Sequence, residues 1–172
     1  MYIDIVEMMR DLLTAGGVIF QVILVVTLGL WILIVERSLY QKLAWPPYVL
    51  TVMAVWKKRV DKRTWQAHRI REMEVSRASI EINALLPLIK TIVALCPLLG
   101  LLGTVTGMIQ VFDNMALSGT GDARMMAAGI SMATLPTMAG MVAALSGLYF
   151  GNRLETSAAM KVEILAEQMT FN

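Results

Sequence analysis

Three long runs of apolar residues, separated by polar stretches, dominate the pattern along the chain. The runs cover residues 17–35, 84–112 and 126–150, and Lys90 is the single charged side chain within them. A helix rises about 1.5 Å per residue, so each run is close to long enough, or more than long enough, to cross a hydrocarbon core of about 30 Å. The pattern therefore predicts an all-α membrane protein with three transmembrane helices.

The polar segments predict the remaining elements. Residues 1–16 place apolar side chains at helical spacing, which favours a short amphipathic helix on the outer membrane face. A frayed start to the first span is the alternative. Pro46 and Pro47 are expected to break the helix within the polar segment 36–83. Residues 151–172 alternate charged and apolar positions, and we expect a long helical extension that packs against the basic segment.

The distribution of basic residues predicts the orientation in the membrane. Eleven of the fifteen Lys and Arg residues lie between Arg37 and Lys90. Basic loops stay on the cytoplasmic side, so 36–83 and 151–172 are expected in the cytoplasm. The N-terminus and the loop 113–125 are then periplasmic. The basic segment is interpreted as a topology signal, with anionic lipid binding as a secondary role and no role in nucleic acid binding.

Composition supports the membrane assignment and excludes several other classes. The chain has 172 residues, 57% hydrophobic and 16% charged, with a mean hydropathy of +0.64. No linker-like stretch divides it, so one domain over 1–172 is expected. Cys96 and His68 are the only residues of their types. We therefore expect no disulfide within the chain, no metal site, no cofactor and no catalytic residues.

Closely spaced glycines distinguish the second and third spans. Pairs of small residues four positions apart let membrane helices approach closely. They predict that these two spans pack against each other. The helix-packing candidates are Gly100, Gly103, Gly107, Gly129, Gly140 and Gly147.

Threonines lie among these glycines, and they are the candidate functional residues. Thr104 and Thr137 fall at similar depth if the two spans are antiparallel neighbours, and Thr134 lies one turn before Thr137. Hydroxyls repeated around a ring of subunits would line a pore and hold water or a partner's carboxylate. Alternatively, each hydroxyl bonds back to a carbonyl of its own helix. No Asp or Glu lies in the three apolar runs, so a complete proton path would need an acid from another subunit.

The segment Gly-Leu-Leu-Gly-Thr-Val-Thr-Gly at 100–107 and the Gly-Ile…Ala…Thr…Gly…Val-Ala-Ala pattern at 129–144 resemble the signature spans of the MotA/TolQ/ExbB proton-channel family. A short form of ExbB is the most similar branch. The resemblance implies a homo-oligomeric, pentameric channel in the bacterial inner membrane, with Thr104 and Thr137 at the family's threonine positions. It also implies an ExbD-like single-span partner that carries an aspartate, and a TonB-like protein that is energised. Met132 stands where ExbB-type proteins often carry glutamate.

Two alternatives to the ExbB-like interpretation stay open. A TolQ-like subunit would have the same fold and would drive outer-membrane maintenance. A passive scaffold would assemble membrane proteins without moving ions.

Overall fold

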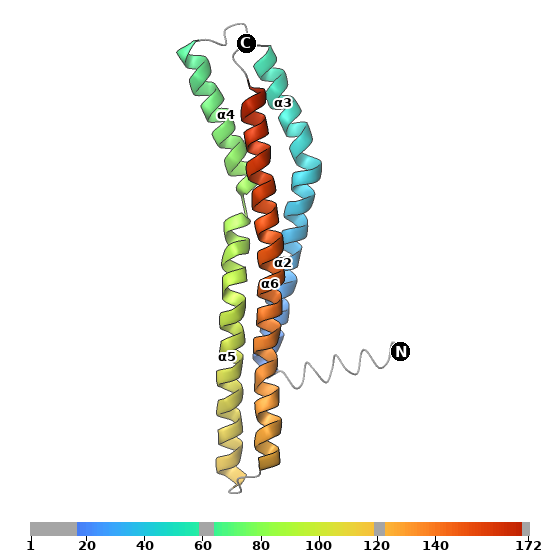
Figure 1. Ribbon diagram of the computed structural model, residues 1–172, viewed down its shortest axis with the longest axis vertical. Helices are drawn as coiled ribbons and strands as arrows, with labels where there is room; N and C mark the ends of the chain where they lie inside the picture. The colour runs from blue at the N-terminus through green and yellow to red at the C-terminus, as the bar shows by residue number, and fades with distance from the viewer. Residues whose placement is uncertain (1–16, 59–63, 119–122, 170–172) are drawn as a thin grey trace, which may run out of the picture. The chain divides into compact units, whose positions relative to one another are not determined.

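The structure is a computed structural model that describes residues 17–58, 64–118 and 123–169, and helices are the only regular secondary structure within these ranges. The amphipathic helix expected at 1–16 lies outside the described residues. The elements in chain order (Figure 1) are α2 (Gly17–Leu39), the π-helix η1 (Tyr40–Ala44), α3 (Trp45–Lys57), α4 (Trp65–Asn83), α5 (Leu86–Ser118) and α6 (Ala123–Gln168).

Three helical stretches are long and apolar enough to cross a membrane, as the hydropathy pattern predicted. They are Gly17–Lys57, Trp65–Leu117 and Met126–Gln168. The expected loop 113–125 was wrong over most of its length, because α5 continues to Ser118 and α6 already begins at Ala123. Residues 113–118 contain neither glycine nor proline, so nothing in this stretch stops the helix.

The expected helix break at Pro46 and Pro47 was also wrong. Helix α2 continues into η1, and the Trp45 backbone N–H donates to the Tyr40 carbonyl, a π-type bond five residues back. The two prolines then occupy the first turn of α3. A proline is tolerated there because backbone N–H groups in a first turn need no helical partner.

The helical backbone is interrupted instead between α4 and α5. Leu85 has a φ of +67°, a left-handed conformation that side chains other than glycine adopt rarely. Pro87 follows in the first turn of α5, where its fixed φ suits a helix start. The second apolar stretch therefore begins as a new helix at Leu86.

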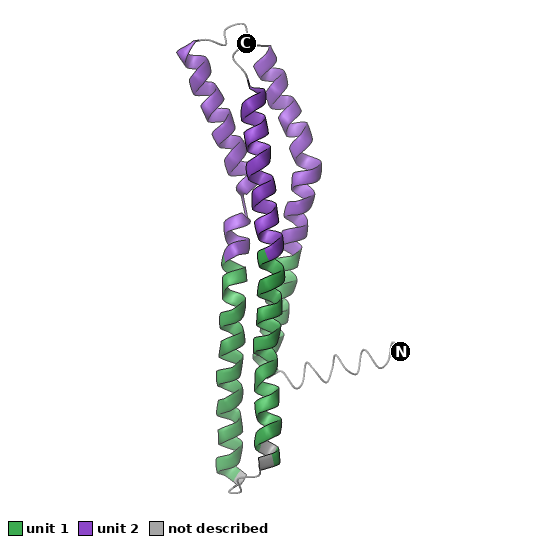
Figure 2. Ribbon diagram, viewed as in Figure 1, with its two compact units in different colours: residues 1–31, 91–148 green, residues 32–90, 149–172 purple. Residues whose placement is uncertain are grey.

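The chain forms two compact units, each described by itself below (Figure 2). Unit 1 comprises 1–31 and 91–148, of which 1–16 and 119–122 are not described. Its core is a seam between α5 and α6 whose buried positions recur every three or four residues, the spacing that keeps one helical face turned toward a neighbour. The buried positions are Val93, Cys96, Gly100 and Gly103 on α5, and Ala133, Pro136, Gly140, Ala143 and Gly147 on α6.

Unit 2 comprises 32–90 and 149–172, described except for 59–63 and 170–172. Its buried side chains include Ala78, Ile82, Ile89, Leu154, Ala158 and Leu165. The Arg71 guanidinium donates to the carbonyls of Ala166 and Met169 at 2.5 and 2.9 Å. Arg71 thus holds the C-terminal end of α6 against α4, as expected for the tail and the basic segment.

Candidate functional site

Helices α5 and α6 approach each other so closely that side chains are excluded at several positions. A β-carbon added at Gly140 would lie 2.5 Å from the Cys96 carbonyl oxygen, and one at Gly107 would lie 2.7 Å from Ala133 Cβ. Gly100 would similarly meet the Thr137 backbone at 2.9 Å. Since Gly107 contacts Ala133 and Gly100 contacts Thr137, the two helices run antiparallel.

The other three packing candidates also lie at close contacts. A β-carbon at Gly103 would lie 2.4 Å from Pro136 Cβ, and one at Gly129 would lie 2.3 Å from a Val111 methyl group. Gly147 faces both Val93 and Leu30, so α2 also packs against α6 at this position. All six glycines nominated from the sequence therefore face a neighbouring helix, whereas Gly29 has no heavy atom within 4 Å of its β-carbon position.

Among the candidate hydroxyls, Thr137 makes the contact between helices. Its Oγ1 donates to the Gly100 carbonyl oxygen at 3.0 Å. The bond stands at the point where the Gly100 backbone and the Thr137 backbone are close. Because the hydroxyl proton is used in this bond, the Thr137 oxygen remains available to other groups only as an acceptor.

Thr104 and Thr134 bond within their own helices. Thr104 donates to the Leu101 carbonyl at 2.7 Å, and Thr134 donates to the Ser131 carbonyl at 2.8 Å. Thr134 is exposed and Thr104 is half-buried in the single chain. Both oxygens retain lone pairs, so both can accept a hydrogen bond from water or from a protonated carboxyl group of another chain.

A groove of about 340 Å³ lies beside this seam in unit 1. Thr106, Gln110 and Asn114 line it from α5, at positions four residues apart, and Met132 lines it from α6. Sequence reasoning missed Gln110 and Asn114, although two amides one helical turn apart near the end of an apolar run were a usable signal. Met132 is 47% exposed.

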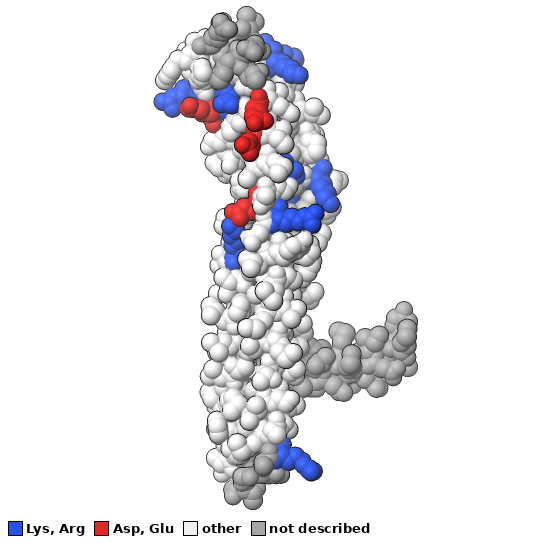
Figure 3. All heavy atoms as spheres, viewed as in Figure 1, with Lys and Arg blue, Asp and Glu red and all other residues white. Residues whose placement is uncertain are grey.

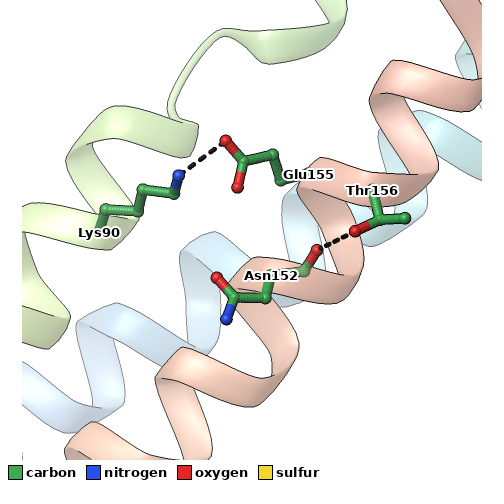
Figure 4. A network of polar contacts seen from close by, with 4 residues as sticks. All are labelled: Lys90, Asn152, Glu155 and Thr156. Atoms are coloured by element: carbon green, nitrogen blue, oxygen red, sulfur yellow. Dashed lines mark hydrogen bonds and ion pairs between the residues drawn. The ribbon is translucent and has the colours of Figure 1, made fainter.

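Lys90 finds an acidic partner within unit 2 (Figure 4). Its Nζ lies 2.7 Å from a Glu155 carboxylate oxygen, and both side chains are about half exposed. The next residue, Thr156, donates to the Asn152 carbonyl at 3.0 Å. We expect the ion pair to contribute little stability, because exposed pairs are screened by solvent, but it does occupy the Glu155 carboxylate.

A second polar group in unit 2 surrounds Arg37, which is 3% exposed. Its guanidinium lies 4.5 Å from the centre of the Tyr40 ring and donates to the Glu81 carbonyl. The Tyr40 hydroxyl donates to the Glu81 carboxylate at 2.8 Å. Burial lowers the pKa of Arg37, and burial followed by the Glu81 contact raises the pKa of Tyr40. This group joins α2 and η1 to α4.

The described residues contain no group of His, Cys, Asp and Glu able to hold a metal ion. The candidate site in unit 1 consists of backbone carbonyls, hydroxyls and amides, and these groups neither bind nor release protons near neutral pH. Such an arrangement can position water or a partner's acid but cannot itself carry a proton as a titrating group.

Comparison with known proteins identifies the family. The family model described as the MotA/TolQ/ExbB proton channel family matches residues 47–167, a stretch that includes α4, α5 and nearly all of α6. The chain therefore belongs to the MotA/TolQ/ExbB proton channel family, which confirms the resemblance of the two glycine-rich segments.

The similar curated proteins carry ExbB names. Over 64 residues the chain is 50% identical to a putative biopolymer transport protein ExbB-like 1 of Synechocystis sp., covering 36% of this chain and 25% of the relative. It is 30% identical over 95 residues to the biopolymer transport protein ExbB of Helicobacter pylori, covering 55% and 63%. The matched part of the chain thus spans between a quarter and somewhat under two-thirds of these relatives.

Proposed function

We propose that this chain is an ExbB-like subunit of a proton-driven motor in the bacterial inner membrane. Its membership of a proton channel family carries the proposal, since the matched residues include the tightly packed helices α5 and α6. In this proposal several copies, with five as the expected number, surround an ExbD-like single-span partner. Proton flow through the assembly energises a TonB-like protein and thereby outer-membrane uptake of iron-siderophore, haem or a similar nutrient.

The chemistry divides between two chains. The three apolar runs of this chain contain no Asp, Glu or His, so the partner supplies the group that binds and releases the proton. The oxygens of Thr104, Thr134 and Thr137 accept hydrogen bonds from water or from the protonated carboxyl group. This chain then acts as a rigid, polar-lined wall for the partner's acid.

The expected orientation belongs to the same proposal. The N-terminus is periplasmic and the C-terminus cytoplasmic, because the basic residues concentrate between the first and second spans. The helix α6 continues past the apolar run to Gln168, which gives the cytoplasmic side a long helical extension.

Deletion of the gene in its own host tests the proposal. Energy-dependent uptake of siderophore or haem should fall and should recover when the intact gene is restored. Unchanged uptake together with new detergent sensitivity would contradict the ExbB-like role and favour the TolQ-like one. An intact phenotype in both assays, with loss of a membrane complex on native gels, would favour the scaffold.

A further inference from the structure

A groove of about 440 Å³ in unit 2 changes character along its length. Ile34 and Phe150 line its apolar end, where the first and third apolar runs of the sequence finish. Ser38 and Arg153 follow one helical turn further along their helices, and Lys42 and Lys161 lie beyond them. Its lining residues come from α2, η1 and α6, and the polar ones are Ser38, Gln41, Lys42, Arg153, Ser157 and Lys161.

The positive charge of this groove is not balanced within it. Lys42, Arg153 and Lys161 line it and no carboxylate does. Figure 3 shows that most Lys and Arg side chains on the visible face lie in unit 2, with Asp and Glu side chains beside some of them. Glu155, two residues from Arg153, is paired with Lys90 instead. Across the described ranges, no ion pair joins the three groove cations to an acid.

Hydrogen bonds hold two of the lining residues, Gln41 and Lys161, in place. Gln41 is 3% exposed, and its amide donates to the Leu154 carbonyl at 3.0 Å. The Lys161 ammonium donates to the Gln41 backbone carbonyl at 2.8 Å. Burial, and then the positive charge of Lys42, lower the pKa of Lys161. An ammonium carries three donors, so Lys161 is held in place with donor capacity left for an anion.

We propose that this groove binds the phosphate headgroup of an anionic phospholipid. The phosphate lies among Lys42, Arg153 and Lys161, where charge-assisted hydrogen bonds are strong, and Ser38 and Ser157 supply hydroxyl donors. The acyl chain runs along Ile34 and Phe150. This apolar end favours a lipid over a free phosphate ion, since it lies where the apolar runs meet the polar segments. The proposed lipid site does not rest on the proton-driven function proposed above.

The test measures thermal unfolding of the full-length protein, purified in a neutral detergent, as lipid is added. Phosphatidylglycerol should raise the unfolding temperature in a saturable way, whereas phosphatidylcholine or inorganic phosphate should not. The double variant Lys42→Gln/Arg153→Gln should need about thirtyfold more phosphatidylglycerol for half the effect, since each of the two basic residues contributes separately to anionic-lipid binding. Both side chains are exposed, so their replacement should leave the fold intact.

Lys57→Gln/Lys58→Gln is the matched control, because it removes the same charge from exposed residues at the end of α3, outside the groove. This control should respond as the unaltered protein does. An equal response of the groove variant and the control would overturn the proposal. So would stabilisation by inorganic phosphate alone, or a change in subunit number in the groove variant with an unaltered lipid response.

Discussion

At the scale of single residues, Thr137 differs from the other two threonines because its hydroxyl bonds across to α5. Thr137→Val keeps the branched shape and removes this bond. We therefore expect the variant to assemble, with a free energy of unfolding lower by about 0.5–1.5 kcal/mol. Uptake in the complemented deletion strain should fall, because the acceptor oxygen is also lost. Thr137→Ser should restore most of the uptake. Normal uptake by the valine variant, at equal protein level, would remove Thr137 from the proposed proton path.

Tyr48 gives a second prediction at this scale. Its ring stacks on Trp45 at a centroid distance of 5.6 Å, but its buried hydroxyl has no hydrogen-bond partner among the described residues. Tyr48→Phe keeps the stacking and removes an unsatisfied polar atom. The free energy of unfolding should therefore stay the same or rise by about 1 kcal/mol at pH 7. Chemical denaturation of the purified protein measures this change.

The alkaline behaviour of Tyr48→Phe is a further check on the same residue. Burial, followed by the negative charges of Glu81 and Glu74, raises the pKa of Tyr48. The unfolded chain then loses its phenol proton at lower pH than the folded chain, so stability falls as the pH rises above about 10. The phenylalanine variant should lose part of this decline. An unchanged slope of stability against pH above 10 would show that Tyr48 ionises normally in the folded protein.

At the scale of elements, the contact between α5 and α6 depends on the absence of side chains. Gly140→Ala would place a methyl group 2.5 Å from the Cys96 backbone carbonyl, which cannot move aside as a flexible side chain does. We expect the free energy of unfolding to fall by about 1–3 kcal/mol and proton-driven uptake to be weaker. Gly29→Ala on α2 is the control, because its β-carbon position is empty within 4 Å. Equal thermal unfolding temperatures for the two variants would contradict the close contact.

The sequence predicted these elements unevenly, and particular residues explain why. The close packing of α5 against α6 was predictable from Gly100, Gly103 and Gly140, because small residues at this spacing let membrane helices approach closely. The helix break predicted at Pro46 and Pro47 was wrong, because the π-helix η1 shifts the backbone hydrogen bonds upstream of them. The local sequence does not specify such a π-helix. The left-handed backbone conformation of Leu85 could not be predicted either, because that conformation is normally adopted by glycine.

The candidate site shows the same division. The threonine positions were evident from the sequence, but the bond partner of each hydroxyl was not. Thr104 and Thr134 have carbonyl acceptors one turn earlier, whereas Thr137 finds one on another helix. Only the packing of α5 against α6 decides between these outcomes. The basic groove was also invisible, because Lys42 and Lys161 are far apart in the chain.

At the scale of the whole molecule, apolar packing and charge are divided between the two units. Among the described residues, unit 1 holds only Asp113 and Arg124 as charged side chains, near the ends of α5 and α6. Unit 2 carries the buried arginine, the ion pair and the basic groove. In the proposed assembly, the apolar unit would lie in the hydrocarbon core while the charged unit would contact headgroups and water.

The apolar unit leads to a prediction about conduction. Carboxylates and histidines are the titratable groups that usually move protons through a membrane, and the apolar runs of this chain contain neither. Liposomes that hold the purified chain alone should therefore show no proton flux above protein-free liposomes under an imposed pH gradient. Co-reconstitution with an ExbD-like partner should produce flux, and an Asp→Asn change in the partner's span should abolish it. Flux through the chain alone would contradict the division of chemistry proposed here. Assembly with the partner but without flux would favour the passive scaffold.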